Sequence, residues 1–74
     1  MNEAEKLRVL IPHWIEHNQE HAAEFRKWAE QAGEARPEIL AAAAEMIRAN
    51  ASLEAALEKL GGALAYDHPH SAHE

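Results

Sequence analysis

Histidines spaced for metal ligation stand in the first third of this 74-residue chain. The segment HWIEHNQEH places His13, His17 and His21 four residues apart. Side chains four apart on a helix are neighbours, with Cβ atoms roughly 5–6 Å apart. Neutral imidazoles are good ligands for nickel, cobalt, zinc and similar divalent metals. The spacing predicts that two of these rings can hold one ion, with His17 and His21 as first candidates and His13 as the next.

Other candidate ligands lie beside this run and near the C-terminus. Glu20 and Glu24 are close enough on the same helix surface to bind the ion, or to accept a hydrogen bond from the second ring nitrogen. The last seven residues contain His68, His70 and His73, a short His-rich tract that can bind borderline metals loosely. The alternative for this tract is a disordered end.

The helical histidines also have an interpretation without metal. In that alternative they form a polar helix edge, on which a partly buried His21 is hydrogen-bonded to Asn18 or to a glutamate. The sequence alone leaves both interpretations open.

Known catalytic motifs with these residue types do not fit. The zincin motif HExxH is absent, because Trp14 and Asn18 follow His13 and His17. The inverted motif HxxEH occurs twice, but such a protease also needs a further ligand and a peptide-binding cleft, which a chain this short can hardly build. Di-iron bundles use ExxH pairs, and neither His17 nor His21 follows a glutamate at that spacing. We therefore expect no enzymatic activity.

Composition narrows the class of protein and its partners. The net charge of -6 argues against a nucleic-acid partner, because phosphate binding needs clustered Lys and Arg. No apolar run is long enough to span a bilayer, and the N-terminus does not resemble a signal peptide. A cytoplasmic location is the default expectation. The chain has no cysteine, so only self-association or a histidine-bound metal could add stability to so small a core.

Helix signals divide the chain into three segments. A first helix is expected from about residue 3 to 31, kinked at Pro12, and a second from about 37 to 60. Gly33 is a good helix stop, Pro37 suits a first helical turn, and Gly61-Gly62 ends the second helix. The short connection predicts an antiparallel hairpin over residues 1–62. Residues 63–74 are expected to be a flexible tail.

Heptad spacing predicts which faces of the two helices meet. Apolar residues alternate steps of four and three along each helix, the pattern of a coiled-coil seam. The first seam comprises Ile11, Ile15, Asn18, Ala22, Phe25, Ala29 and Ala32, and the second Ile39, Ala43, Met46, Asn50, Leu53, Leu57, Leu60 and Leu64. If the turn is centred between Glu34 and Ala35, Asn18 and Asn50 lie at nearly the same height. We expect these two amides to face each other.

A second row beside the first seam contains Trp14, His21 and Trp28, spaced by seven. The tryptophans are expected to anchor the core, with His21 at the edge of the core stripe between them. His17 should lie at the border of the stripe, and His13 should point outward. A hairpin cannot cover its own apolar stripe on both sides. The fold class expected is therefore all-α, a hairpin that dimerises into a four-helix bundle.

The stretch from Leu10 to His21, followed by Phe25 and Trp28, resembles a family of small microbial helical-hairpin proteins whose members often carry histidine-rich extensions. The similarity covers roughly residues 7–62 and implies the hairpin fold. The layout also resembles the nickel chaperone of the carbon monoxide dehydrogenase system, a helical dimer with a His-Trp pair and a histidine-rich C-terminus. His13-Trp14 would match that pair. The chaperone's second histidine would align with Phe25, so this chain departs from the pattern there.

These observations lead to one principal functional prediction. The protein is expected to be a homodimer that binds nickel, cobalt or zinc for delivery, storage or sensing, with a metalloprotein or transporter as its client. His17 and His21 would be the ligands at a subunit boundary. The alternative is a metal-free structural or protein–protein interaction module.

Overall fold

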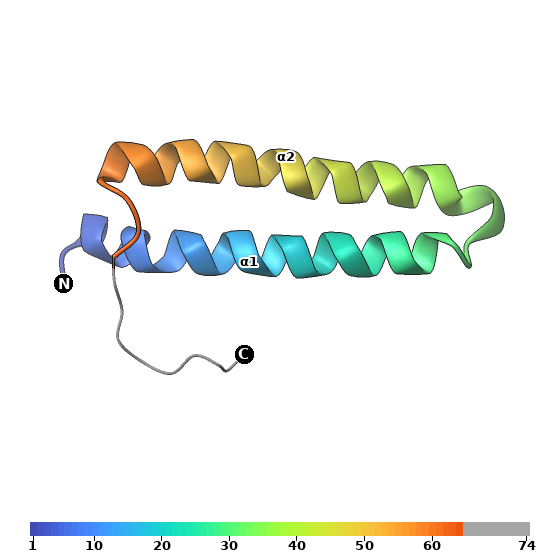
Figure 1. Ribbon diagram of the computed structural model, residues 1–74, viewed down its shortest axis with the longest axis horizontal. Helices are drawn as coiled ribbons and strands as arrows, with labels where there is room; N and C mark the ends of the chain where they lie inside the picture. The colour runs from blue at the N-terminus through green and yellow to red at the C-terminus, as the bar shows by residue number, and fades with distance from the viewer. Residues whose placement is uncertain (65–74) are drawn as a thin grey trace.

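The computed structural model describes residues 1–64 and consists of two long helices in that part of the chain. Helix α1 runs Glu3–Ala29, a single 3-10 turn η1 spans Gly33–Ala35, and α2 runs Arg36–Leu60. The helices lie side by side and antiparallel, so the predicted all-α hairpin is confirmed (Figure 1). α1 ends two residues before the expected position and α2 begins one residue early. Neither helix is long and apolar enough to cross a lipid bilayer.

Local hydrogen bonds explain where the helices begin and end. Asn2 caps α1: its side-chain oxygen accepts from the Glu5 amide at 2.8 Å, and the Asn2 amide donates to Glu5 Oε1 at 3.1 Å. This reciprocal pair satisfies two amides that the helix leaves free. At the same end of the hairpin, where α2 stops, Gly61 adopts φ 112°, which favours glycine. The Gly62 amide then donates back to the Leu57 carbonyl at 2.9 Å and closes α2.

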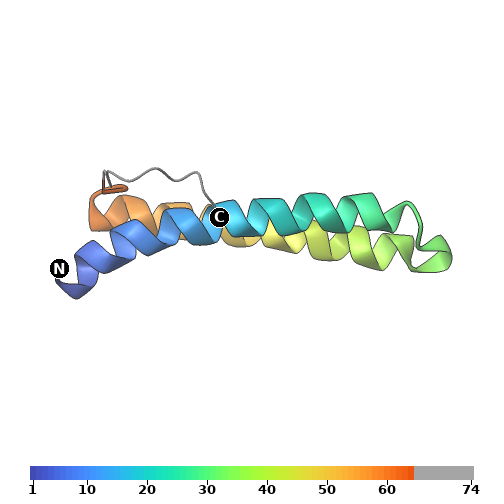
Figure 2. The same ribbon diagram turned by 90° about the horizontal axis from the view of Figure 1, so that it is seen from below.

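Pro12 lies inside α1, and the helix continues through it. Proline has no N–H, so the Arg8 carbonyl four residues earlier loses its helical donor. The amide of Leu64 supplies the missing bond at 3.3 Å, and it comes from the segment that follows α2. The first turns of α1 are inclined relative to the rest of the helix (Figure 2). Pro12 therefore creates the docking point for the chain beyond α2.

The core of the hairpin is the predicted seam. The residues buried most completely all belong to it: Ile11, Ala22, Ala29, Ala43 and Asn50. The larger seam side chains, such as Phe25 and Leu57, are only half-buried, and no large side chain in the described part of the chain is fully buried. One layer of contact between two helices cannot enclose bulky residues. The single hairpin therefore leaves much of its apolar surface in contact with solvent.

The two asparagines face each other across the seam, as the heptads predict. Asn18 Nδ2 donates to Asn50 Oδ1 at 2.9 Å, and Asn50 Nδ2 donates to the Ile15 carbonyl at 3.1 Å. Asn50 is 5% exposed, so these bonds compensate for the removal of its amide from water. A polar pair in an apolar seam fixes the register of the two helices. This contact sets residues 18 and 50 at the same height.

Candidate functional site

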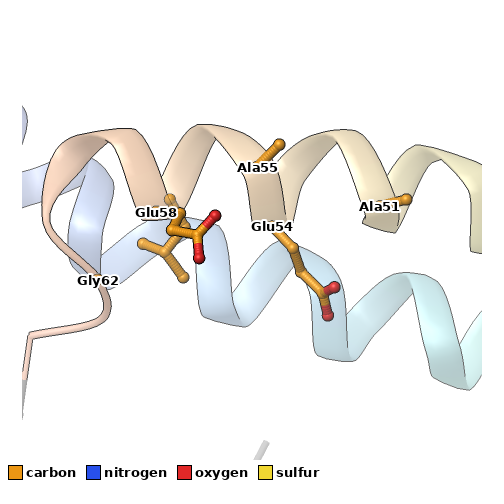
Figure 3. A pocket seen from close by; sticks show the side chains of 6 residues that line it. Ala51, Glu54, Ala55, Glu58 and Gly62 are labelled. Carbon is orange, nitrogen blue, oxygen red and sulfur yellow. The ribbon is translucent and has the colours of Figure 1, made fainter.

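The seam divides the surface of the hairpin into two faces of different chemistry. One, which we name the charged face, carries Arg8, Gln19 and Arg26 of α1 beside Ile47, Glu54 and Glu58 of α2. Figure 3 shows Glu54 and Glu58 extending from α2 over this side of the hairpin, where they line a shallow pocket that ends at Gly62. Two arginines and two glutamates thus lie on this side, and charged groups of both signs keep the face hydrated.

The opposite side, which we name the aromatic face, is apolar near the seam. Its residues are Leu10, Trp14, His17, His21 and Trp28 of α1 beside Ala42, Ala49 and Ala56 of α2, and all of them are exposed. Helical periodicity places both sets on the same side of the antiparallel pair, opposite Glu54 and Glu58. The charged residues on this side lie at the outer edges of the face, away from the seam. They are Glu24 on α1 and Glu38 and Glu45 on α2. An apolar centre within a charged rim is typical of protein–protein interfaces.

The two tryptophans do not anchor the core, which corrects the expectation from sequence. Trp14 is 43% exposed and Trp28 is 56% exposed. Their row is displaced from the seam by part of a helical turn, and the alanines of α2 are too small to reach across and cover the rings. The ammonium of Lys27 lies 5.9 Å from the centre of the Trp28 ring. Both indole rings are therefore accessible to a molecule that binds the aromatic face.

The three helical histidines are exposed on α1 and spread around it. His21 is exposed at the edge of the core stripe, where its ring lies beside the half-buried Phe25, with 6.4 Å between ring centres. His17 follows at the border of the aromatic face, and the helical repeat turns His13 away from α2. Within residues 1–64 no hydrogen bond or ion pair joins these imidazoles to another residue.

The metal-free alternative predicts a hydrogen bond between His21 and either Asn18 or a glutamate. Asn18 donates instead to Asn50, and none of the described glutamates bonds the His21 ring. His21 and His17 therefore keep both ring nitrogens available to a ligand from outside the hairpin.

The carboxylates do not complete a metal site within one chain. Glu20 and Glu24 are both exposed, and helical spacing turns Glu20 to the side of α1 opposite the seam. Among residues 1–64 no group of three or more His, Asp or Glu side chains converges closely enough to hold an ion. One described chain offers the adjacent pair His17 and His21, and Glu24 is the nearer supporting carboxylate. His68, His70 and His73 lie outside the described residues.

Arg8 has a structural role that the sequence analysis missed. Its guanidinium donates to the Gly62 carbonyl at 2.6 Å through Nε and to the Gly61 carbonyl at 3.1 Å through Nη2. With the bond from Leu64 to the Arg8 carbonyl, these contacts fasten residues 61–64 to the first turns of α1. One signal was available: a proline inside a helix leaves a free carbonyl four residues earlier. That rule identifies Arg8, although it does not identify the partner.

Comparison with protein families places most of this chain in a known family. A domain of unknown function, DUF8180, matches residues 7–60, which cover nearly all of both helices. The chain belongs to the DUF8180 family. The matched range contains His13, His17 and His21 and the whole aromatic face, whereas His68, His70 and His73 lie beyond it. No curated protein and no solved structure matches the chain. The family is defined without a function, so the chemistry of the charged face and the aromatic face carries the functional evidence.

Proposed function

We propose that this protein is a self-associating helical module, in which two hairpins pack by their aromatic faces into a four-helix bundle that binds a divalent transition metal. The observation that carries the proposal is the exposure of Trp14 and Trp28 on a face whose charges are confined to the rim. Large exposed apolar patches bordered by polar residues mark interaction sites. The occupant we propose is a second copy of the chain.

The size of the face supports a second copy. Helices of 27 and 25 residues are each about 40 Å long at 1.5 Å per residue. Two helices side by side are roughly 20 Å wide, so the face measures on the order of 800 Å². A standard stable interface takes about 800 Å² from each partner. One face of the hairpin therefore offers the area that a standard interface takes from each partner.

The metal part of the proposal is supported by His17 and His21. They are exposed, lie at the spacing that lets two imidazoles share an ion, and have no partner among residues 1–64. A transition-metal site needs further ligands, which the second copy, Glu24 or water would supply. Nickel, cobalt and zinc suit imidazole ligands, and a site open at a subunit border suits delivery, storage or sensing. A metalloprotein or a metal transporter would be the client.

The association is tested by sedimentation equilibrium on the full chain over a wide concentration range without metal. We expect a monomer–dimer equilibrium, and the emission of Trp14 and Trp28 should shift to shorter wavelength as the dimer forms. A stable monomer at all concentrations would overturn the four-helix bundle.

The metal is tested separately, by titrating the full chain with Ni²⁺, Co²⁺ and Zn²⁺ in a calorimeter. The double variant His17→Ala with His21→Ala should lose at least tenfold in affinity. Gln19→Ala, at an exposed position of α1 on the charged face, is the matched control and should change little. His13→Ala measures what the third candidate ligand contributes. Deletion of residues 67–74 measures what His68, His70 and His73 contribute. If binding survives the double variant and vanishes with the deletion, the helical pair is not the site.

A metal-free interaction module is the second candidate, and the aromatic face itself favours it. This face exposes two tryptophans and Leu10, and its association needs no ion. If the chain dimerises but His17 and His21 bind none of the three metals, the metal-free interaction module is the function supported.

A further inference from the structure

The aromatic face consists of two parallel rows with the same repeat. A ridge of large side chains on α1 lies beside a row of small ones on α2, each with members seven residues apart. The ridge is Trp14, His21 and Trp28, and the alanine row is Ala42, Ala49 and Ala56. Seven residues are nearly two helical turns, so each row runs almost along its helix. The face is therefore high along α1 and low along α2.

The seam contact fixes the heights of the two rows relative to each other. Since Asn18 bonds to Asn50 and the helices are antiparallel, one residue forward along α1 and one back along α2 sets Ala49 level with residue 19. Ala49 thus lies two residues, or about 3 Å of helical rise, from the level of His21. The same offset relates Ala56 to Trp14 and Ala42 to Trp28. Side chains tilt towards the N-terminus of their own helix, and in an antiparallel pair this tilt reduces the offset from both sides.

We infer that in the dimer α1 of each copy lies across α2 of the other, with the ridge of one copy seated on the alanine row of its partner. The inference rests on the proposed self-association and specifies its geometry. A two-fold axis parallel to the helices produces this arrangement and keeps the levels of the rows matched. Large side chains then meet small ones along both lines of contact, which gives an even spacing between the helices.

The competing arrangement has its two-fold axis across the helices, and its packing is uneven. It sets ridge against ridge, with His21 opposite His21 and Trp14 opposite Trp28 of the second copy. It also sets alanine against alanine along the other line of contact. The first pair of helices would be held apart by indole rings while the second pair approached closely, so the two layers could not both close.

The geometry also determines how many ions the dimer takes. With α1 across α2 of the partner, the two α1 helices are diagonally opposed in the bundle, and the two His17–His21 pairs are kept apart. Each pair then lies at its own border between α1 and the partner's α2. The dimer should bind one ion per chain. Ridge against ridge would bring both pairs to one axis and would favour one ion per dimer.

Disulfide formation between single-cysteine variants tests the arrangement, because the natural chain has no cysteine. His21→Cys and Ala49→Cys both change exposed positions, so neither threatens the hairpin. The two full-length variants are mixed without metal, oxidised mildly, and weighed by intact mass spectrometry. A mixture of Gln19→Cys with Ala51→Cys, at similar levels on the charged face, is the matched control. A disulfide requires Cβ atoms within about 4.5 Å of each other.

We expect the mixed product of His21→Cys with Ala49→Cys to exceed the control at least tenfold, while His21→Cys alone gives little. A fast homodisulfide of His21→Cys would overturn the inference and leave the dimer in place, since it reports ridge against ridge. No product above the control, with a dimer in the centrifuge, would overturn the inference as well. No product with a monomer in the centrifuge would instead defeat the proposed self-association on which the inference rests.

Discussion

The charged face and the aromatic face border the same seam and are built from the same two helices. They differ in whether the side chains beside the seam find partners within the chain. On the charged face, the Arg8 guanidinium donates to the Gly61 and Gly62 carbonyls, and the carboxylates of Glu54 and Glu58 are exposed to solvent. On the aromatic face, Trp14 and Trp28 extend beyond the seam and stay 43% and 56% exposed. One face thus completes the fold of a single copy, and the other leaves apolar surface available to a second.

The comparison shows what a two-helix fold can and cannot do. The seam buries three alanines, Ile11 and Asn50 and leaves its other large side chains partly exposed, because two helices touch along a single line. Bulky residues beside that line need a third and a fourth helix to be covered. The exposure of Trp14 and Trp28 next to the seam, with alanines opposite, is therefore the arrangement expected if a second hairpin packs on this face, as proposed.

The strongest test of this contrast substitutes one residue of equal exposure on each face. Trp14 and Ile47 are both 43% exposed, on the aromatic and the charged face respectively. Trp14→Glu should cost the dimer about 3 kcal/mol, since each copy loses roughly half of the burial energy of a large side chain and places a charge in the interface. That is a rise of about 100-fold in the dimer Kd, measured by sedimentation equilibrium. Ile47→Glu should leave the Kd within about threefold of the parent. Equal effects of the two substitutions would remove the distinction between the faces.

Arg8 provides the opposite test, because its contacts lie within one chain. Arg8→Met keeps the length of the side chain and removes both bonds to the Gly61 and Gly62 carbonyls. Hydrogen bonds from charged donors are worth roughly 1.5–3 kcal/mol each when part-buried, and solvent at this edge reduces the sum to about 2 kcal/mol. Urea unfolding at a fixed, low protein concentration should show this loss, and the dimer Kd should stay unchanged. A large change in Kd with little change in unfolding would assign Arg8 to the interface.

The sequence was sufficient for the features that repeat along the chain. Heptad spacing identified the seam, and counting from the turn placed Asn18 opposite Asn50, which their 2.9 Å hydrogen bond confirms. It was insufficient for features that depend on how far a side chain reaches. The spacing that puts Trp14 and Trp28 beside the seam does not reveal that the neighbouring helix offers only alanines there, so it wrongly predicts that both rings anchor the core. The bonds from Arg8 connect residues 53 and 54 positions apart, and no periodic pattern indicates them. The metal and the partner stay predictions.

Substitution of Pro12 should have opposite effects on two properties. It should stabilise α1 and weaken the hydrogen bond that attaches Leu64 to Arg8. In Pro12→Ala the new amide can bond the Arg8 carbonyl, which at present accepts from Leu64 at 3.3 Å. Removing a proline from a helix interior should raise the free energy of unfolding by about 1–2 kcal/mol, less than the full penalty of ~3 kcal/mol because the helix already accommodates the ring. Hydrogen exchange at the Leu64 amide should accelerate in the same variant. Slower or unchanged exchange at Leu64 would show that its bond does not depend on the proline.

Substitution of Lys27 is expected to have the smallest effect on stability and on the dimer Kd. The size of that effect shows whether Lys27 lies inside or outside the aromatic face. Its ammonium lies 5.9 Å from the centre of the Trp28 ring, on an exposed turn near the end of α1. An exposed cation–π contact contributes about 0.5–1 kcal/mol, so Lys27→Met should lower the free energy of unfolding by no more than that. The substituted side chain is apolar and covers the same ring edge, so the dimer Kd should change by less than about threefold. Circular dichroism during urea unfolding measures the first quantity and sedimentation the second. A tenfold change in Kd would place Lys27 inside the interface, and the boundary of the aromatic face would then lie further around α1 than Trp28.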